Sequence, residues 1–345
     1  MCENSNLIIS IGIVALNEES YLPDLLNDIN NQNYEKKNIE LIFVDSGSCD
    51  KTISIFWDFK KRFDNVFHSI RVLDNLKKKQ SSGWNVVISN YTGDVLLRID
   101  AHARIPSDFV KNNVKYLKKG EMVVGGLRSV KNSQNSNWND TLLIAELSLF
   151  GSSIAGYRRM NEEKYVNSMF HAAYKREVIN NTGYFNEYLG RTEDNEYHYR
   201  IRKKGYKLYY NSEIYSYQII RSNLRKMIHQ KFLNGYWIGL TLSVCANCLQ
   251  IYHFIPFLFI MAIFFSLLLF INNISFPFFL LIGIYGMFVI LNTLISFKEK
   301  KSNITTIALL YIFPLLHISY GLGTLIGIVK IPFWKERKLA KRYTI

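Results

Sequence analysis

The chain has 345 residues, of which 48% are hydrophobic, and its formal net charge is +14. The charge is unevenly placed, since residues 232–297 and 302–329 contain no Asp, Glu, Lys or Arg. These uncharged stretches exclude a wholly soluble chain and favour a soluble part followed by a membrane part. No nucleic-acid motif accompanies the basic residues, which flank the apolar stretches. We therefore expect membrane lipid and phosphate-bearing substrates as partners, and no nucleic acid.

Short apolar runs alternate with helical patterns in the first hundred residues. Leu7–Val14, Ile39–Val44 and Val95–Ile99 are predicted to be buried strands, while Tyr21–Ile29 and Thr52–Phe63 have helical spacing. A polar or acidic residue follows each strand. The pattern predicts an α/β domain with a mostly parallel sheet over residues 1–220, whose ligands bind beyond the carboxyl ends of the strands.

The N-terminus and the cysteines give little functional information. The apolar run near the N-terminus has no basic segment before it, so we expect no signal peptide and a cytoplasmic first domain. Cys2 and Cys49 are isolated. Cys245 and Cys248 form a C-x-x-C without further ligands, which favours apolar packing over a metal or redox site.

Asp45 ends a predicted strand in the sequence VDSGSCD. A carboxylate at this position can accept hydrogen bonds from a nucleobase, and the small residues after it allow a ligand to approach. Asp-Ser-Gly is also a common turn sequence, so this motif alone is weak.

Asp100 ends the next clear strand, and His102 follows two residues later. When the backbone leaves the strand, both side chains can point to one site. A nucleotide-sugar diphosphate needs a divalent cation as it departs, and Mn²⁺ accepts imidazole as well as oxygen ligands, whereas Mg²⁺ prefers oxygen. Asp100 and His102 are therefore candidate ligands of Mn²⁺ or Mg²⁺, although a D-x-H triplet is common.

Residues 191–200, RTEDNEYHYR, resemble the start of a helix with acidic residues in its first turn. One interpretation is simple stabilisation of the helix dipole. The other makes Asp194 a general base that takes the proton of an acceptor hydroxyl. Glu196 and Arg200 are four residues apart and are expected to pair, which leaves Asp194 available.

The C-terminal third changes character after Arg221. Residues 221–250 mix basic and aromatic residues as interfacial amphipathic helices do. Residues 251–331 are predicted to form a transmembrane region, followed by a basic tail at 332–345. We also expect a polar loop at Lys131–Asn139.

Ile251–Ile271 and Phe276–Ile295 are each long enough to span a membrane. The third apolar stretch, Ile304–Val329, contains Pro314 and a Gly-Leu-Gly sequence near its middle. The positive-inside rule favours a re-entrant pair of half-helices here, because the basic tail would then return to the cytoplasm. A tilted single span is the alternative.

The ordered set LNEESYL, VDSGSCDKT, LRIDAHARIPSDFV, FHAAYKREV, GYFNEYLGRTEDNEYHYRIRKKGY and HISYGLG resembles family 2 glycosyltransferases. The most similar group is that of bacterial succinoglycan-biosynthesis-type membrane glucosyltransferases. The resemblance runs from about residue 9 to about residue 323 and implies a GT-A fold, an inverting mechanism, a UDP-sugar donor and a polyprenyl-diphosphate-linked saccharide acceptor. It also implies a multi-pass protein of the cell membrane with a cytoplasmic catalytic domain.

The resemblance also assigns roles to individual residues. Asn17, Glu18 and Asp45 match positions that hold the nucleotide, Asp100 matches the first acid of the metal-binding D-x-D, and Asp194 matches the catalytic base. Most relatives carry an acid where this chain has His102. Glu193 stands where relatives carry an acid or an amide.

Three functions remain open at this level. The first is transfer of a hexose, such as glucose, to a lipid-linked saccharide in cell-surface polysaccharide biosynthesis. A polyprenyl-phosphate glycosyltransferase is the second, and a non-catalytic membrane scaffold is the third. A processive synthase is disfavoured, because Leu233 replaces the arginine of the Q-x-x-R-W region and the membrane part is too small for a channel.

Overall fold

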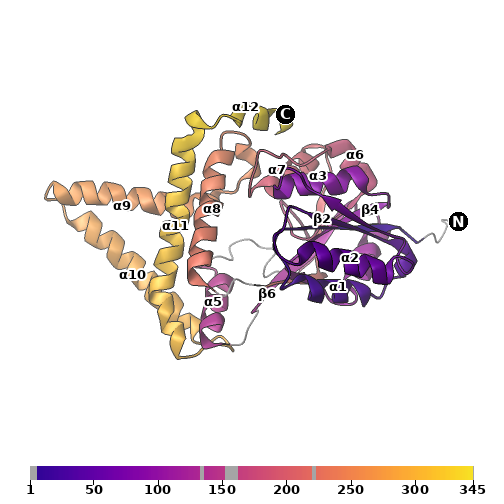
Figure 1. Ribbon diagram of the computed structural model, residues 1–345. Coiled ribbons are helices and arrows are strands. Elements are labelled where there is room, and N and C mark those ends of the chain that lie inside the picture. Colours follow the sequence, from indigo (N-terminus) through magenta and orange to yellow (C-terminus); the bar gives the residue numbers. More distant parts are fainter. Residues whose placement is uncertain (1–5, 133–135, 152–161, 220–222, 345) are drawn as a thin grey trace. The chain divides into compact units, whose positions relative to one another are not determined.

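The structure is a computed structural model, and it describes residues 6–132, 136–151, 162–219 and 223–344. The chain forms two compact units (Figure 1). The first unit comprises Met1–Ser129 and Tyr157–Ile219, and the second comprises Val130–Gly156 and Ile220–Ile345. Residues 130–156 lie in the range expected for the first domain, yet they cluster with the second unit.

A mixed nine-stranded sheet organises the first unit, with strand order β3-β2-β1-β4-β8-β6-β9-β5 and with β7 paired to β9. The four strands β3, β2, β1 and β4 are parallel, whereas β8 joins β4 in the antiparallel direction. The strands of the described chain are β1 (Ile9–Ala15), β2 (Ile39–Asp45), β3 (Ser69–Asp74), β4 (Val95–Asp100), β5 (Ala103–Arg104), β6 (Val123–Lys131), β7 (Lys164–Val166), β8 (Ala173–Lys175) and β9 (Leu208–Ile219).

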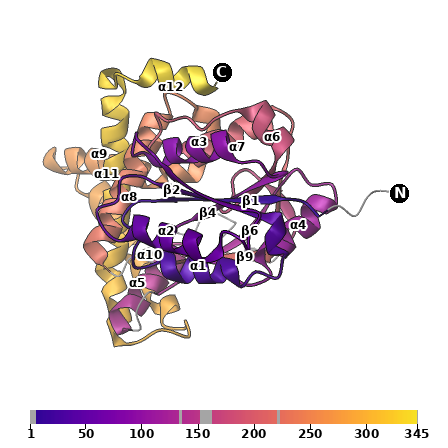
Figure 2. The same ribbon diagram turned by 45° about the vertical axis from the view of Figure 1, so that its right-hand side comes forward.

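Helices cover both faces of this sheet, as Figure 2 shows. The side chains of β1 and β2 alternate between the two faces, so each strand contributes to two apolar cores. Ile11 and Phe43 pack toward α1, α2 and α4, whereas Val44 packs toward α3, α6 and α7. These helices are α1 (Leu22–Asn30), η1 (Lys36–Asn38), α2 (Thr52–Phe63), α3 (Gln80–Asn90), α4 (Phe109–Lys118), α6 (Arg176–Thr182) and α7 (Glu193–Lys203).

The register of the parallel strands brings the predicted polar strand ends to one edge. Ala15 pairs with Asp45, and Val14 pairs with Asp100. The carboxyl ends of β1, β2 and β4 therefore meet, as expected for a ligand-binding edge of an α/β sheet. The prediction of an α/β fold with a mostly parallel sheet and C-terminal apolar helices is confirmed.

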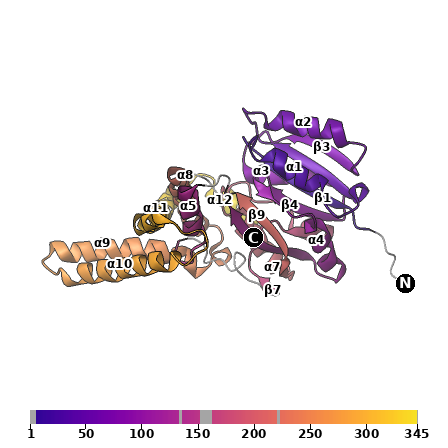
Figure 3. The same ribbon diagram turned by 90° about the horizontal axis from the view of Figure 1, so that it is seen from below.

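The second unit is helical. Helices α9 and α10 form a hairpin, α11 runs across the open end of that hairpin, and α8 lies on the other side of α11 (Figures 1 and 3). Its elements are α5 (Asn137–Leu147), α8 (Leu224–Thr241), η3 (Ala246–Cys248), η4 (Ile251–Phe254), α9 (Ile255–Ile271), α10 (Phe276–Ser296), η5 (Ile304–Ala308), α11 (Leu309–Lys330), η6 (Ile331–Phe333) and α12 (Arg337–Thr344).

Within the described chain, three segments are long and apolar enough to cross a membrane: Ile251–Ile271, Phe276–Ser296 and Ile304–Phe333. Only 11% of each of the first two is buried inside the protein, against 39% of the third. Their exposed apolar side chains indicate membrane association.

Two expectations from the sequence are wrong. The third apolar stretch has no break near Pro314, because α11 continues through this proline as one helix and so excludes a pair of half-helices. The segment 131–139 is not entirely a loop, since α5 begins at Asn137 and the Ser136 hydroxyl caps it by accepting a hydrogen bond from the backbone N–H of Asn139 (3.1 Å). Residues 133–135 lie outside the described residues.

Candidate functional site

The residues singled out in the sequence come from three strand ends at the carboxyl edge of the sheet and from the start of one helix. Asn17 and Glu18 follow β1, and Asp45 ends β2. Asp100 ends β4, and Asp194 lies in the first turn of α7. The edge therefore collects side chains that are up to about two hundred positions apart in the chain.

Asp45 and Asn17 shape the loop that follows β2. The Asp45 carboxylate accepts hydrogen bonds from the backbone N–H groups of Gly47 (3.0 Å) and Ser48 (3.1 Å) and from the Ser48 hydroxyl (2.6 Å). Asn17 has a left-handed φ of 56°, and its side-chain oxygen accepts from the N–H of Cys49 (2.8 Å). Both side chains thus hold the backbone of this loop in one conformation by hydrogen bonds, without a ligand.

His102 is bound on both sides of its ring. Its Nδ1 lies 3.1 Å from Oε1 of Glu18, and its Nε2 lies 2.9 Å from the side-chain amide nitrogen of Gln218. Burial would lower the pKa of His102, but the Glu18 hydrogen bond and the negative charge of Asp100 outweigh this and raise its pKa. Glu18 and His102 therefore contact each other in the structure, whereas the sequence analysis assigned Glu18 to the nucleotide and His102 to the metal.

Asp100 is 6% exposed, and its Oδ1 accepts no hydrogen bond from the residues that the structure describes. Burial opposes its ionisation, but the positive field of Arg98 in particular lowers the pKa of Asp100. His171 Nε2 lies 3.9 Å from Oδ2. Burial lowers the pKa of His171 to about 3, so its imidazole is neutral at pH 7. Asp100 is consequently a buried, ionised carboxylate whose Oδ1 accepts no hydrogen bond within the described residues and lies 3.6 Å from Nη2 of Arg98.

Arg98 connects the two acidic parts of the site, and the sequence analysis did not identify it. Its guanidinium lies 3.6 Å from Asp100 and 3.8 Å from Glu193, and it is centred 4.6 Å from the ring of Trp84. Arg98 stands in the middle of the buried strand VLLRID. An arginine inside such an apolar strand was the signal to recognise, because a buried cation requires buried anions near it.

Glu193 and Asp194 start α7 with neighbouring carboxyl groups. Burial, together with the charge of Asp194, raises the pKa of Glu193 to about 8. Burial also raises the pKa of Asp194, against the attraction of Arg98. Asp194 accepts a hydrogen bond from the N–H of Asn195 (2.8 Å). Glu193 is thus poised for proton exchange near neutral pH, and Asp194 holds a proton more readily than an ordinary aspartate does.

The expected pairing further along α7 is confirmed. Arg200 binds Glu196 with its Nε 2.7 Å from Oε1. Arg200 also donates to the backbone carbonyl oxygens of Thr182 and Tyr184, both at 2.6 Å. The pair anchors α7.

The donor atoms at this edge fit a divalent cation in part. Oδ1 of Asp100, which accepts no hydrogen bond from the described part of the chain and lies beside the Arg98 guanidinium, is a suitable hard ligand. His102 must give up its contact with Gln218 or Glu18 to bind a metal. No cluster of three or more His, Cys, Asp or Glu side chains with metal-site geometry occurs in the described ranges. A cation here would therefore need the oxygen atoms of a substrate diphosphate to complete its coordination.

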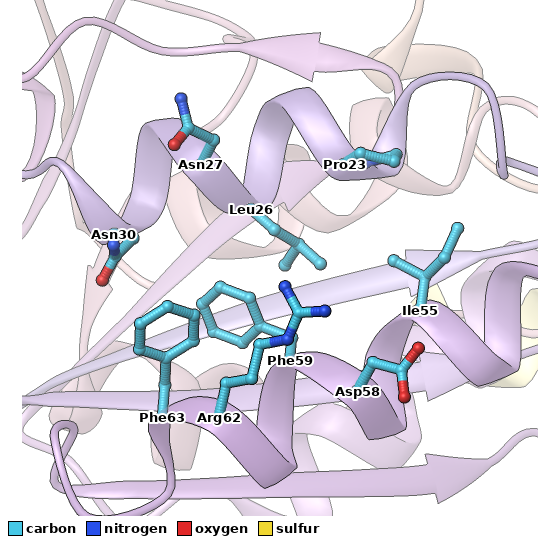
Figure 4. A pocket seen from close by; sticks show the side chains of 9 residues that line it. All are labelled: Pro23, Leu26, Asn27, Asn30, Ile55, Asp58, Phe59, Arg62 and Phe63. Atoms are coloured by element: carbon cyan, nitrogen blue, oxygen red, sulfur yellow. The ribbon is translucent and has the colours of Figure 1, made fainter.

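A separate surface pocket of about 340 Å³ lies between α1 and α2 (Figure 4). It contains none of the predicted site residues. Its lining residues are Pro23, Leu26, Asn27, Asn30, Ile55, Asp58, Phe59, Arg62 and Phe63. We assign this pocket no role in the chemistry at the strand ends.

The fold, with acidic side chains gathered at the carboxyl edge of its sheet, is GT-A-like. The class of protein is therefore that of proteins with a GT-A-like fold. It resembles that of the mannosyltransferase PcManGT from Pyrobaculum calidifontis, solved in complex with GDP-Man and Mn²⁺, with a TM-score of 0.59 and 14% sequence identity over 93% of this chain and 88% of that one. The sequence model of Glycosyl transferase family 2 matches residues 10–183. The chain belongs to this family.

Two relatives cover much of the chain. A dolichyl N-acetyl-alpha-D-glucosaminyl phosphate 3-beta-D-2,3-diacetamido-2,3-dideoxy-beta-D-glucuronosyltransferase of Methanococcus voltae is 30% identical over 328 residues, which is 93% of this chain and 97% of the relative. The succinoglycan biosynthesis protein ExoA of Rhizobium meliloti is 26% identical over 243 residues, which is 69% of this chain and 70% of that protein.

Proposed function

We propose that the protein transfers a sugar from a nucleotide-sugar donor, in our hypothesis a UDP-hexose, to a hydroxyl group of a saccharide carried on a polyprenyl phosphate or diphosphate. The name of the Methanococcus relative specifies a dolichyl-phosphate-linked sugar as its acceptor, and that relative aligns over nearly the whole chain. A sugar hydroxyl is a weak nucleophile, so this reaction needs a general base at the site.

The observation that carries the proposal is the grouping of two buried acidic centres around Arg98, which lies 3.6 Å from Asp100 and 3.8 Å from Glu193, the neighbour of Asp194. Asp194 serves as the base that takes the proton of the acceptor hydroxyl. Asp100 lies 3.6 Å from the same guanidinium, and in this proposal the diphosphate leaves beside it. Attack from one side and departure from the other is a single in-line displacement with inversion, so an α-linked donor yields a β-linked product.

In this proposal Asn17, Glu18 and Asp45 hold the nucleotide. Asn17 and Asp45 act by shaping the loop after β2. Asp100 and His102 would hold Mn²⁺ or Mg²⁺, which supplies positive charge to the departing diphosphate. Activity should then be lost in chelator and restored by either ion. Full activity in excess chelator would exclude the cation.

The test is to incubate the purified protein with a panel of nucleotide-sugars and lipid-linked saccharides and to measure the nucleotide diphosphate released. We expect release that depends on both a donor and a saccharide-bearing lipid. Release with the bare lipid phosphate instead would favour a polyprenyl-phosphate glycosyltransferase. Failure of every donor, including the absence of slow hydrolysis, would favour a non-catalytic scaffold.

A further inference from the structure

Helix α11 is apolar enough to cross a membrane, but two of its packing partners, α5 and α8, carry charged side chains. Along its first half, Leu309, Phe313 and Leu316 join Leu142 of α5 and Met227 of α8 in one buried cluster. Its second half packs against α8 at backbone contact distance. One whole side of α11 is therefore covered by α5 and α8, which accounts for its larger buried share.

Glycines fix the level of α8 relative to α11. A Cβ added to Gly323 would lie 2.1 Å from the carbonyl oxygen of Phe232, and one added to Gly235 would lie 2.0 Å from that of Tyr320. The same relation holds at Gly327, whose Cβ would meet the oxygen of Tyr236 at 2.2 Å. The two helices thus run parallel and in contact, and they cannot occupy different depths in a membrane.

The start of α8 carries charge beside the middle of α11. Arg225, Lys226 and His229 are exposed, and Lys231 forms an ion pair with Glu146 of α5 at 2.8 Å. These residues precede Phe232, the residue that faces the central part of α11. If α11 crossed the membrane, they would lie near the bilayer centre, where each charged side chain costs about 3 kcal/mol or more.

Part of the surface of α11 that α5 and α8 do not cover is exposed and apolar. Its members, each between 36% and 60% exposed, are Leu310, Tyr311, Leu315, Ile318, Leu322, Ile326 and Val329. The hairpin of α9 and α10 lies across α11 from α8, as Figures 1 and 3 show, and α10 contacts α11 through a hydrogen bond between Tyr285 and His317 (2.9 Å). Basic residues flank α11 at both ends: residues 298–301 precede it, and residues 330–342 include its last residue and the chain that follows.

We propose that α11 lies in the plane of the membrane face, with this apolar surface on the acyl chains and with α8 and α5 toward the water. Only the α9–α10 hairpin then crosses the bilayer. The basic segments at both ends of α11 meet anionic lipid headgroups on one and the same side. Trp334, which follows α11, contacts Trp237 of α8 (ring centres 6.2 Å apart) and keeps the tail on the side of α8.

Thiol labelling tests the side on which the tail lies. In a Cys2→Ser, Cys49→Ser background, which keeps the buried Cys245 and Cys248, one cysteine is added at exposed Arg342, Lys300 or Asn272. An impermeant reagent is applied to intact cells and to inverted vesicles. We expect Arg342→Cys and Lys300→Cys to react on the same side as native Cys49 of the unsubstituted protein, and Asn272→Cys, in the hairpin tip, on the opposite side. Reaction of Arg342→Cys together with Asn272→Cys would overturn the proposal.

Depth measurement tests the orientation of α11 itself. Spin labels at exposed Tyr311, Ile318 and Ile326 are compared for their accessibility to oxygen and to a water-soluble nickel chelate in reconstituted vesicles. An in-plane helix gives one shallow depth at all three positions. A deep value at Ile318 between two shallow ones would show that the helix crosses. Neither measurement depends on glycosyl transfer, so failure here leaves the proposed function untouched.

Discussion

Glu193 and Asp194 are adjacent in the chain, but we expect different consequences from replacing them. Asp194→Asn should preserve nucleotide binding and lower turnover by at least about 10²-fold, because the amide cannot accept the hydroxyl proton. Glu193, whose pKa is raised to about 8, is mostly protonated at pH 7, so Glu193→Gln should keep turnover within about threefold. The release of nucleotide diphosphate measures both variants.

The pH profile separates the two roles further. Above about pH 8 Glu193 becomes charged beside Asp194, which should change the alkaline limb of the wild-type profile, and Glu193→Gln should remove that change. If Asp194→Asn retained more than half of normal turnover, the assignment of the base would be wrong. Loss of activity in Glu193→Gln comparable to that in Asp194→Asn would show that turnover needs Glu193 as much as Asp194.

Glu40 connects the amino ends of the central strands through hydrogen bonds. It is fully buried in β2 and accepts hydrogen bonds from Ser10, from Arg71 and from both the N–H (2.7 Å) and the hydroxyl (2.9 Å) of Thr92. Burial alone would raise the pKa of Glu40, but these hydrogen bonds and Arg71 lower it overall. Because the folded pKa is depressed, the stabilisation is present above about pH 4.5 and is lost as pH falls through the folded pKa.

Glu40→Gln should therefore lower the free energy of unfolding at pH 7 by about 2 kcal/mol, since a buried hydrogen-bonded charge is replaced by an amide that mismatches its donors. Thermal unfolding of the solubilised protein, followed from pH 7 to pH 3, measures this. The difference between wild type and variant should shrink on the acid side of pH 4.5. A constant difference over the whole range would contradict the role of the charge.

Glycine contacts between α8 and α11 give a second prediction at this scale. Gly323→Ala places a methyl group against the carbonyl oxygen of Phe232, so the helices must separate and the protein should unfold at lower temperature. Gly286→Ala in α10 is the matched control, because nothing lies within 4 Å of its Cβ position. There the gain in helix propensity, about 1 kcal/mol, should leave the stability equal or higher. Equal loss in both variants would refute the packing argument.

The sequence predicted the elements that depend on local pattern. The runs ending at Asp45 and Asp100 are strands, and the helix beginning with Glu193 contains the expected Glu196–Arg200 pair. It could not predict contacts created by the sheet register, such as Arg98 lying between Asp100 and Glu193, because these depend on which strands are neighbours. The break expected at Pro314 was wrong for a related reason. A proline within a helix is tolerated where neighbouring helices stabilise it, and local pattern does not reveal those neighbours.

For the whole molecule, the hairpin should decide how firmly the chain is held in the membrane. Phe264 of α9 and Met287 of α10 are 52% and 58% exposed near the middle of their helices, so both face lipid in a membrane-inserted hairpin. Replacing both by Asp should cost about 5 kcal/mol or more of insertion free energy and shift the protein into the fraction extracted by alkaline carbonate.

Trp57→Asp is the control, since Trp57 is a 51% exposed apolar residue on α2 of the first unit. Its variant should stay in the carbonate-resistant membrane fraction like the wild type. Equal extraction of the two variants would show that the hairpin does not anchor the chain, because a charge on the first unit would then be as disruptive as charges in the bilayer.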